Sequence, residues 1–150
     1  MNEGIFLHST SLLDDTFFEN TVIYLTEHNE KGAMGFVVNQ PFPRKINELK
    51  EFSQSIAFPL YIGGPVDQEH IYFIHSRPDL ISGSDHIKDN IYLGGDFKSA
   101  IQHINGRELT EKDIKIFIGY CGWDDQDLEE EINEGSWEIE TAGTPFQQLT

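Results

Sequence analysis

The sequence predicts a single α+β domain over residues 1–150, with a mixed, largely antiparallel sheet that could be barrel-like and about three covering helices. A chain of 150 residues suffices for one domain that buries roughly 70% of its unfolded surface. One apolar run, Ile114–Trp123, has the composition of a central strand. Short β-rich runs alternate with helical stripes, and their connections have both hairpin and crossover lengths.

The run Ile114–Trp123 is the predicted centre of the sheet. In its first seven residues only Lys115 and Gly119 are polar or small, too few for one face of a strand to meet water. We expect Gly119 and Gly122 to end this strand, because glycine permits either a turn at positive φ or the close approach of another backbone. Residues 124–134 follow with seven carboxylates in eleven positions, a pattern typical of a solvated helix face.

The N-terminal part predicts one strand and then a hairpin. Gly4–His8 is a short apolar strand, and Asn20–Thr26 and Ala33–Val38 are β-rich runs whose connection ends in Gly32. Glycine suits this last turn position because a positive φ costs it little. The segment Asn39–Pro43 predicts the end of the second run, since proline has no N–H for a ladder.

The middle of the chain predicts a helix and three short strands. Apolar residues near helical spacing in Ile46–Ile56 predict a helix over one sheet face. The predicted strands are Pro59–Ile62, His70–His75 and Asn90–Leu93, and the loop Gly63–Val66 interrupts the chain after the first of them.

Two further helices and a last strand complete the prediction. Asp96–Ile104 has an apolar stripe and an aspartate that can cap its N-terminus. Asp125–Asn133 is the third predicted helix, and Ser136–Glu140 is the last strand. Residues 141–150 are rich in glycine, threonine and glutamine, so we expect a frayed tail.

Composition restricts the class of protein. The net charge of −16 and the isoelectric point near 4.5 disfavour direct binding to nucleic acid, because Lys and Arg supply most of that affinity. The single Cys121 cannot form an internal disulfide, and no basic region precedes the short apolar segment at the N-terminus. No apolar run approaches the ~18 residues of a membrane helix. We therefore expect a cytoplasmic protein that does not bind membranes.

Several segments occur together in a recognisable order: Glu27–Asn39, Phe58–Val66, Phe117–Trp123, and Leu128–Ile132 with Trp137. Together they resemble the AlgH/YqgE family of uncharacterised bacterial proteins, from about Gly4 to Trp137. The resemblance implies a compact domain of the family's own α/β type and brings with it the label of transcriptional regulator, which the acidic composition does not support through direct DNA contact. Where relatives usually have a small residue this chain has Cys121, so thiol chemistry here would not transfer to the family.

Cys121 has two interpretations. It lies at the predicted end of a strand, where clefts form, and His28, His75 or His8 could act as its base. Cysteine is also among the most buried residue types and packs as a small apolar side chain. The structural interpretation is favoured, because the carboxylates that follow would raise the pKa of a thiol.

A set of residues around the family-like segments is the candidate cleft. These residues are His28, Asn39, Gly63, Gly64, Pro65, Tyr120, Cys121, Gly122 and Trp123. The glycines could present amides to an anion, but tight turns are the favoured explanation, because no Lys or Ser/Thr follows in phosphate-loop spacing. The polar side chains could border a ligand, or they could satisfy backbone groups at turns.

No catalytic constellation or metal-ligand spacing is present in the sequence, so we expect no catalytic residues, no metal and no cofactor. The hypothesis is a non-enzymatic ligand- or protein-binding or regulatory domain, whose partner is an unidentified small molecule or protein. The alternative is an enzyme or redox sensor that depends on Cys121. Self-association through a large surface is a further alternative.

Overall fold

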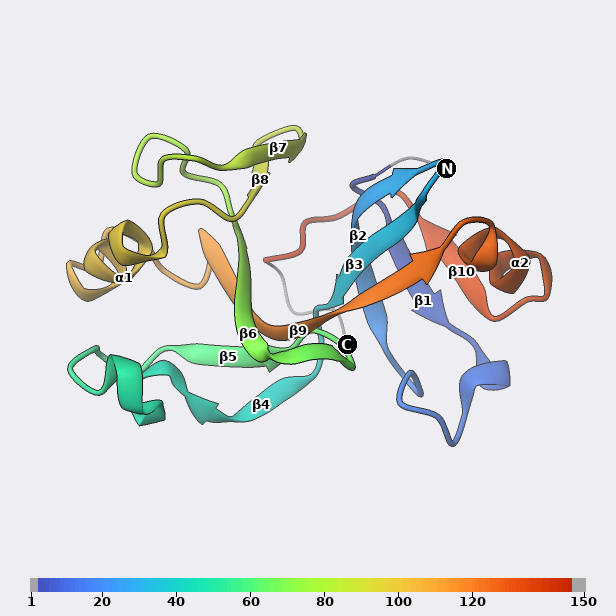
Figure 1. Cartoon of the computed structure of the whole chain (residues 1–150), viewed down its shortest axis with the longest axis horizontal. Coiled ribbons are helices and arrows are strands. Elements are labelled where there is room, and N and C mark those ends of the chain that lie inside the picture. The colour runs from blue at the N-terminus through green and yellow to red at the C-terminus, as the bar shows by residue number, and fades with distance from the viewer. Residues whose placement is uncertain (1–2, 147–150) are drawn as a thin grey trace.

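The computed structural model describes residues 3–146 and contains a ten-stranded sheet (Figure 1). The strands are β1 (Phe6–Ser9), β2 (Val22–Asn29), β3 (Gly32–Val37), β4 (Pro41–Lys45), β5 (Pro59–Ile62), β6 (Val66–His75), β7 (Asp85–Lys88), β8 (Ile91–Leu93), β9 (Ile114–Asp124) and β10 (Trp137–Glu140). The α-helices are α1 (Phe97–Asn105) and α2 (Asp127–Asn133), and short 3₁₀ helices are η1 (Ser11–Leu13), η2 (Ile46–Glu48) and η3 (Lys50–Phe52). The α+β class and the largely antiparallel sheet are confirmed.

Strand β9 is the centre of the sheet, as predicted. Its first half pairs antiparallel with β6 and parallel with β5, while its second half pairs antiparallel with β3. Ile116 and Phe117 in this strand are completely buried. The hydrogen-bonded path runs β10-β1-β2-β3-β9-β6-β8-β7, with β4 and β5 to one side. Because this path through residues 3–146 has two ends, the sheet is open.

The prediction that Gly119 and Gly122 end the central strand is wrong, because β9 continues to Asp124. Gly119 has a φ of 74° and lies between the two halves of the strand. A Cβ atom at Gly119 would come within 2.6 Å of the Gly64 carbonyl oxygen, and one at Gly64 within 2.1 Å of the Tyr120 carbonyl oxygen. The glycines therefore allow the backbone of the loop after β5 to touch the backbone of β9, and β9 continues beyond this contact.

The N-terminal hairpin is confirmed. Strands β2 and β3 pair antiparallel, and Gly32 after their turn has a φ of 141°. Strand β3 ends at Val37 as the prolines suggested, but Pro41–Lys45 then forms β4, which was not predicted. Among residues 3–146 this strand pairs with β5 alone, and an edge position tolerates proline because its outer side needs no N–H donor.

Two predicted helices are confirmed and one is wrong. Helix α1 begins after Asp96, whose Oδ1 accepts a hydrogen bond from the Lys98 N–H at 3.1 Å. The predicted helix Ile46–Ile56 is instead the pair η2 and η3, interrupted at Leu49, whose backbone is extended. Because β4 and β5 are antiparallel neighbours, the segment between them must reverse the direction of the chain. The apolar spacing that suggested a helix still packs Leu49 against one core cluster.

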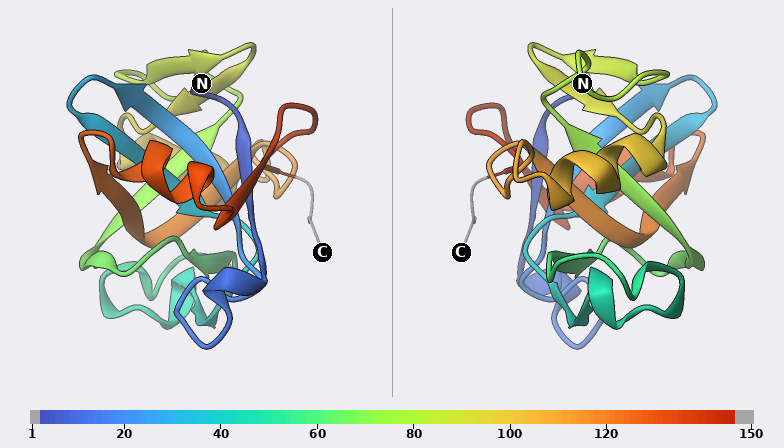
Figure 2. Two further views of the ribbon diagram at one scale, coloured as in Figure 1. Left: turned by 90° about the vertical axis from the view of Figure 1, so that its right-hand side faces the viewer. Right: turned by 90° about the vertical axis from the view of Figure 1, so that its left-hand side faces the viewer.

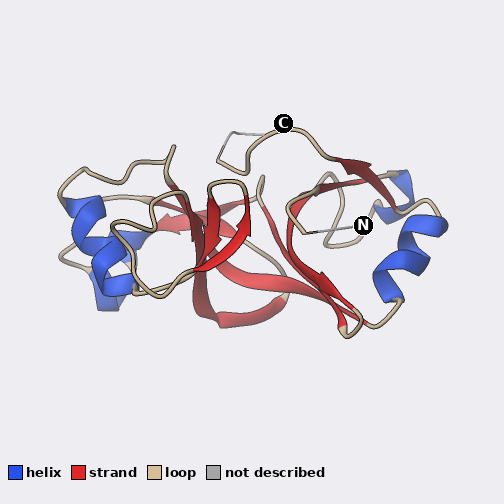
Figure 3. Ribbon diagram, turned by 90° about the horizontal axis from the view of Figure 1, so that it is seen from above, coloured by secondary structure: helices blue, strands red, loops and turns tan. Residues whose placement is uncertain are grey.

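The helices cover opposite ends of the molecule. Figure 1 shows α1 and α2 at the two ends of the long axis, and the two views of Figure 2 show each helix lying across strands. Seen from above, the strands occupy the middle between them (Figure 3). One core cluster lies under α1, a second lies under α2, and a third around Phe36 and Phe117 lies between these two.

The predicted tail lies partly within the described part of the chain. Residues 141–146 are described, and Phe146 is half-buried against the central cluster. The rest of the predicted tail, residues 147–150, lies outside the described residues.

We predict that Gly119→Ala destabilises the fold strongly, while Gly122→Ala is tolerated. Alanine at Gly119 would need a positive φ and would meet backbone oxygens at 2.6 and 2.8 Å. These two effects should cost at least about 2 kcal/mol of unfolding free energy. A Cβ at Gly122 would meet only the Tyr120 ring, at 3.4 Å. Urea unfolding of both variants measures the difference, and equal midpoints would contradict the inferred close approach.

Candidate functional site

Cys121 is a buried side chain on β9. It is 1% exposed, and its Sγ donates to the Gly63 carbonyl oxygen at 3.4 Å. Burial raises the pKa of the thiol to about 12. The group is therefore a neutral thiol at physiological pH, and it packs as a small apolar residue beside α2.

The predicted loop glycines support close packing of backbones. Gly63 and Gly64 are buried, and a Cβ atom on either would come within 2.4 Å of backbone atoms of β9. The Gly64 carbonyl oxygen accepts a hydrogen bond from Gln68 Nε2 at 2.9 Å. Pro65 is exposed. This loop connects β5 to β6 and packs directly against the middle of β9.

His28 and Asn39 lie near opposite ends of β2. The Asn39 side chain accepts from the Val22 N–H at 2.9 Å and donates to the Asn20 carbonyl oxygen at 3.0 Å, so it satisfies backbone groups. His28 lies six residues beyond Val22 on β2, so it is about 20 Å from the residue that Asn39 contacts. Its Nε2 is 3.5 Å from Glu129 Oε2 of α2. The structure does not bring these two side chains together.

The aromatic members of the predicted cleft contact their own neighbours. The Tyr120 ring packs edge-on against Tyr72, with centroids 5.4 Å apart. Trp123 Nε1 donates to Glu131 Oε1 at 3.2 Å, and Trp137 Nε1 donates to the same oxygen at 3.0 Å. The shared carboxylate ties α2 to β9 and β10. Gly122 is exposed between these aromatic residues.

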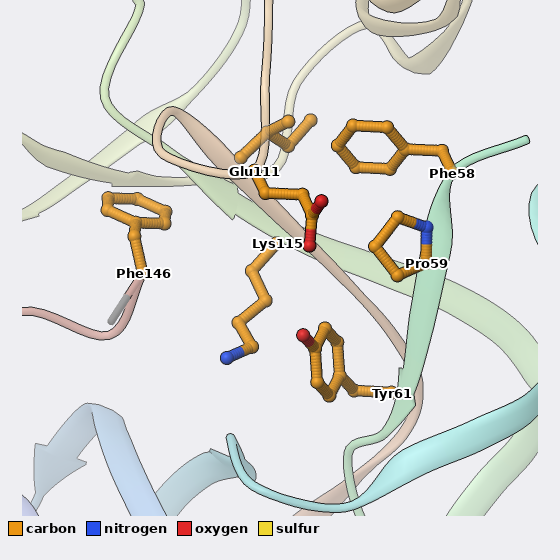
Figure 4. Close-up of a pocket in the computed structure, with 7 residues that line it drawn as sticks. Phe58, Pro59, Tyr61, Glu111, Lys115 and Phe146 are labelled. Atoms are coloured by element: carbon orange, nitrogen blue, oxygen red, sulfur yellow. The ribbon is translucent and has the colours of Figure 1, made fainter. Parts of the chain in front are cut away.

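A cavity around Lys115 is the strongest candidate site, although the sequence-based set did not include this residue. Its volume is about 210 Å³. The lining residues are Phe58, Pro59, Tyr61, Glu111, Ile114, Lys115 and Phe146 (Figure 4). They come from β5 and the residue before it, from the turn that precedes β9, from β9 itself and from the C-terminal segment.

Lys115 is a buried residue that lines this cavity and has no acidic partner among residues 3–146. The residue is only 4% exposed, and its Nζ lies 4.1 Å from the centre of the Tyr61 ring. No carboxylate oxygen within residues 3–146 lies within 4.0 Å of that nitrogen. The ring face attracts the ammonium but does not replace the hydration that burial removes.

Burial lowers the pKa of Lys115 to about 8, and the negative charge of Glu111 partly opposes this effect. Burial also raises the pKa of the Tyr61 hydroxyl, with a smaller contribution from Glu111. A strongly perturbed lysine that lines a cavity marks a candidate functional site, because an unpaired buried charge costs stability.

The sequence contained one signal for this site. Lys115 interrupts an otherwise apolar, β-branched strand, where a charged side chain is unusual. The signal could not show what surrounds the amine, since Phe58, Tyr61 and Phe146 are distant from it along the chain.

A second polar cluster lies on β6. The Asp67 carboxylate accepts from the Tyr72 hydroxyl at 2.5 Å and contacts His70 Nδ1 at 2.7 Å. These contacts lower the pKa of Asp67 and raise that of His70, but the carboxylate and the imidazole are exposed to water.

Within residues 3–146 no three His, Cys, Asp or Glu side chains are grouped to hold a metal ion. Neither α1 nor α2 has the length and hydrophobicity of a membrane-spanning helix.

The fold and the cavity together define a small α+β domain with a buried lysine on its central strand. The family model described as AlgH-like matches residues 6–146 of this chain. The chain therefore belongs to the AlgH-like family, and the resemblance found in the sequence is confirmed.

Relatives of this chain share the designation UPF0301. A UPF0301 protein of Chlorobium limicola is 41% identical over 89% of this chain and 71% of its own length. A UPF0301 protein of Parabacteroides distasonis is 38% identical over 91% of this chain and 70% of its own length. Their names state no activity.

Solved structures confirm the architecture. The solution structure of the AlgH protein from Pseudomonas aeruginosa is 27% identical, with a TM-score of 0.74 over 93% of this chain and 77% of its own. A crystal structure of a Corynebacterium diphtheriae protein has a TM-score of 0.79 at 17% identity, over 99% of this chain and 80% of its own, and supports the fold alone.

We predict that Cys121 resists alkylation in the native protein. A thiol that is buried and has a pKa near 12 presents almost no thiolate at neutral pH. Mass spectrometry after iodoacetamide treatment between pH 6 and pH 8 should show no adduct until denaturant is added, with Cys121→Ser as the blank. Rapid native labelling at pH 6 would instead indicate an exposed thiolate.

We predict that Lys115 makes stability rise with pH between about 8 and 10.5. The folded pKa lies below the ordinary lysine value, so in this window the unfolded chain binds more protons than the folded chain. The gain over the window is about 3 kcal/mol of unfolding free energy relative to Lys115→Met. Urea unfolding at a series of pH values measures this difference.

The matched control for this experiment is Lys112→Met, which alters an exposed lysine three residues earlier. Its unfolding free energy should follow that of the wild type through the whole pH window. A constant difference between wild type and Lys115→Met from pH 7 to pH 10.5 would contradict the burial of the ammonium.

Proposed function

We propose that this member of the AlgH-like family is a non-enzymatic binding domain for a small organic anion, held by Lys115 in its cavity. One observation carries the proposal: Lys115 is a buried residue that lines the cavity, and no carboxylate oxygen among residues 3–146 lies within 4.0 Å of its Nζ. A buried charge is costly unless it is paired, and the carboxylate of a ligand would supply the missing partner.

The dimensions of the cavity favour a small ligand. Cavities of about 150 Å³ can hold a benzene molecule. The cavity beside Lys115 is about 210 Å³, so it admits a single ring or a branched aliphatic group together with a carboxylate. Phe58, Pro59 and Phe146 offer apolar contacts for the body of such a ligand.

The surroundings of Cys121 support binding rather than thiol chemistry. A nucleophilic or redox-active cysteine needs a thiolate and access to its substrate. Burial of this side chain and its raised pKa oppose both requirements. The net charge of −16 disfavours a nucleic acid as the ligand, because phosphate binding depends on Lys and Arg.

We predict that the protein binds isocaproate more tightly than its neutral amide, isocaproamide. The two molecules have the same branched body, and only the carboxylate can pair with the ammonium. Lys115→Met should weaken isocaproate binding by about tenfold or more, the loss typical of one charge-assisted hydrogen bond. Calorimetric titration at pH 7 measures the dissociation constants.

Lys112→Met is again the matched control and should bind isocaproate as the wild type does. A circular dichroism spectrum of each variant verifies that it is folded. Absence of isocaproate binding at millimolar concentration, or equal binding by wild type and Lys115→Met, would refute the proposed site.

A further inference from the structure

We propose that the anion is one end of a zwitterion: the ligand is an α-amino acid with a small apolar side chain. Lys115 pairs with its carboxylate, Glu111 pairs with its ammonium, and the apolar wall contacts its side chain. This assignment rests on the proposed function of the cavity and specifies the chemical class of the ligand.

The first reason is that the cavity carries one charge of each sign. Lys115 and Glu111 both line it, four positions apart in the sequence. They form no ion pair with each other, since their charged atoms are more than 4.0 Å apart. Figure 4 shows both side chains beside the same space, with the Tyr61 ring next to the lysine chain. A ligand with two opposite charges would bridge them.

The second reason is that the two charged side chains differ in their exposure to solvent. Lys115 is 4% exposed, whereas Glu111 is exposed to solvent. The ligand carboxylate would therefore point inward to the buried ammonium, and its own ammonium would stay near the opening. That orientation leaves the cation of the ligand partly hydrated, so its desolvation costs little.

The third reason is the apolar part of the lining. Phe58 is buried, and Pro59 and Phe146 are half-buried at the same cavity. These side chains would contact an aliphatic or small aromatic substituent, and the volume of about 210 Å³ limits its size.

The same arrangement disfavours other charged ligands. A dicarboxylate would place its second charge near the Glu111 carboxylate, which repels it. A diamine would place a cation against the Lys115 ammonium. Of the small charged classes, only a molecule with one carboxylate and one nearby ammonium satisfies both side chains.

The test compares three probes that share one branched aliphatic chain. L-leucine carries both charged groups, isocaproate lacks the amine, and isoamylamine lacks the carboxylate. Calorimetric titration at pH 7 should give a leucine affinity about threefold above that of isocaproate, because an exposed ion pair contributes modestly. Isoamylamine should bind at least tenfold more weakly than leucine, since it leaves the buried ammonium unpaired.

Variants of the two charged side chains separate their roles. Glu111→Gln should weaken leucine binding about threefold and strengthen isocaproate binding, because the same carboxylate attracts one probe and repels the other. Lys115→Met should weaken both probes by about tenfold or more. Lys112→Met should change neither affinity.

The outcomes distinguish the two proposals. If isocaproate binds through Lys115 but leucine binds no more tightly, or if Glu111→Gln strengthens leucine binding, the amino-acid assignment is overturned and the anion-binding function stands. If neither probe binds, both proposals are overturned. Opposite responses of the two probes to Glu111→Gln would support the assignment.

Discussion

The contact between the backbone of β9 and the loop after β5 is the constraint on which the rest of the structure depends. At Gly119 and Gly64 a single added carbon would collide with main-chain oxygens, so only glycine allows the two segments to touch. The contact lies at the point where β9 leaves β5 and β6 and continues beside β3. One strand thereby joins both halves of the sheet, and each half supports its own helix and core cluster (Figure 1).

The same strand places the candidate site. Lys115 lies in the first half of β9, with β6 on one side and β5 on the other, so its backbone is held firmly. Its amine is directed to the Tyr61 ring and the cavity, where it lowers stability instead of raising it. Well-packed clusters elsewhere, such as the stacked pair Phe36 and Phe117, offset this cost. A rigid strand holds the side chains of a binding site more precisely than a loop does.

The sequence predicted most elements because their signals are local. The buried run of β9, the hairpin with Gly32 and the caps and stripes of two helices each depend on neighbouring residues. The prediction of a helix at Ile46–Ile56 was wrong because the same apolar spacing also suits two short 3₁₀ helices between antiparallel strands. Strand β4 was missed because its pairing with β5, not its own proline-rich composition, makes it a strand. Burial of Cys121 agrees with the structural interpretation of that residue.

By itself, the sequence determined the fold class, the central strand, most of its neighbours and membership of the AlgH-like family, because periodicity and motif order are properties of the chain alone. Only the tertiary structure decided where a ligand could bind. Lys115 is an anomaly in the sequence, but its cavity is built from residues 58, 59, 61, 111, 114, 115 and 146. Their spatial proximity, and the desolvation that changes the chemistry of the amine, exist only after β5, β9 and the C-terminal segment have packed together.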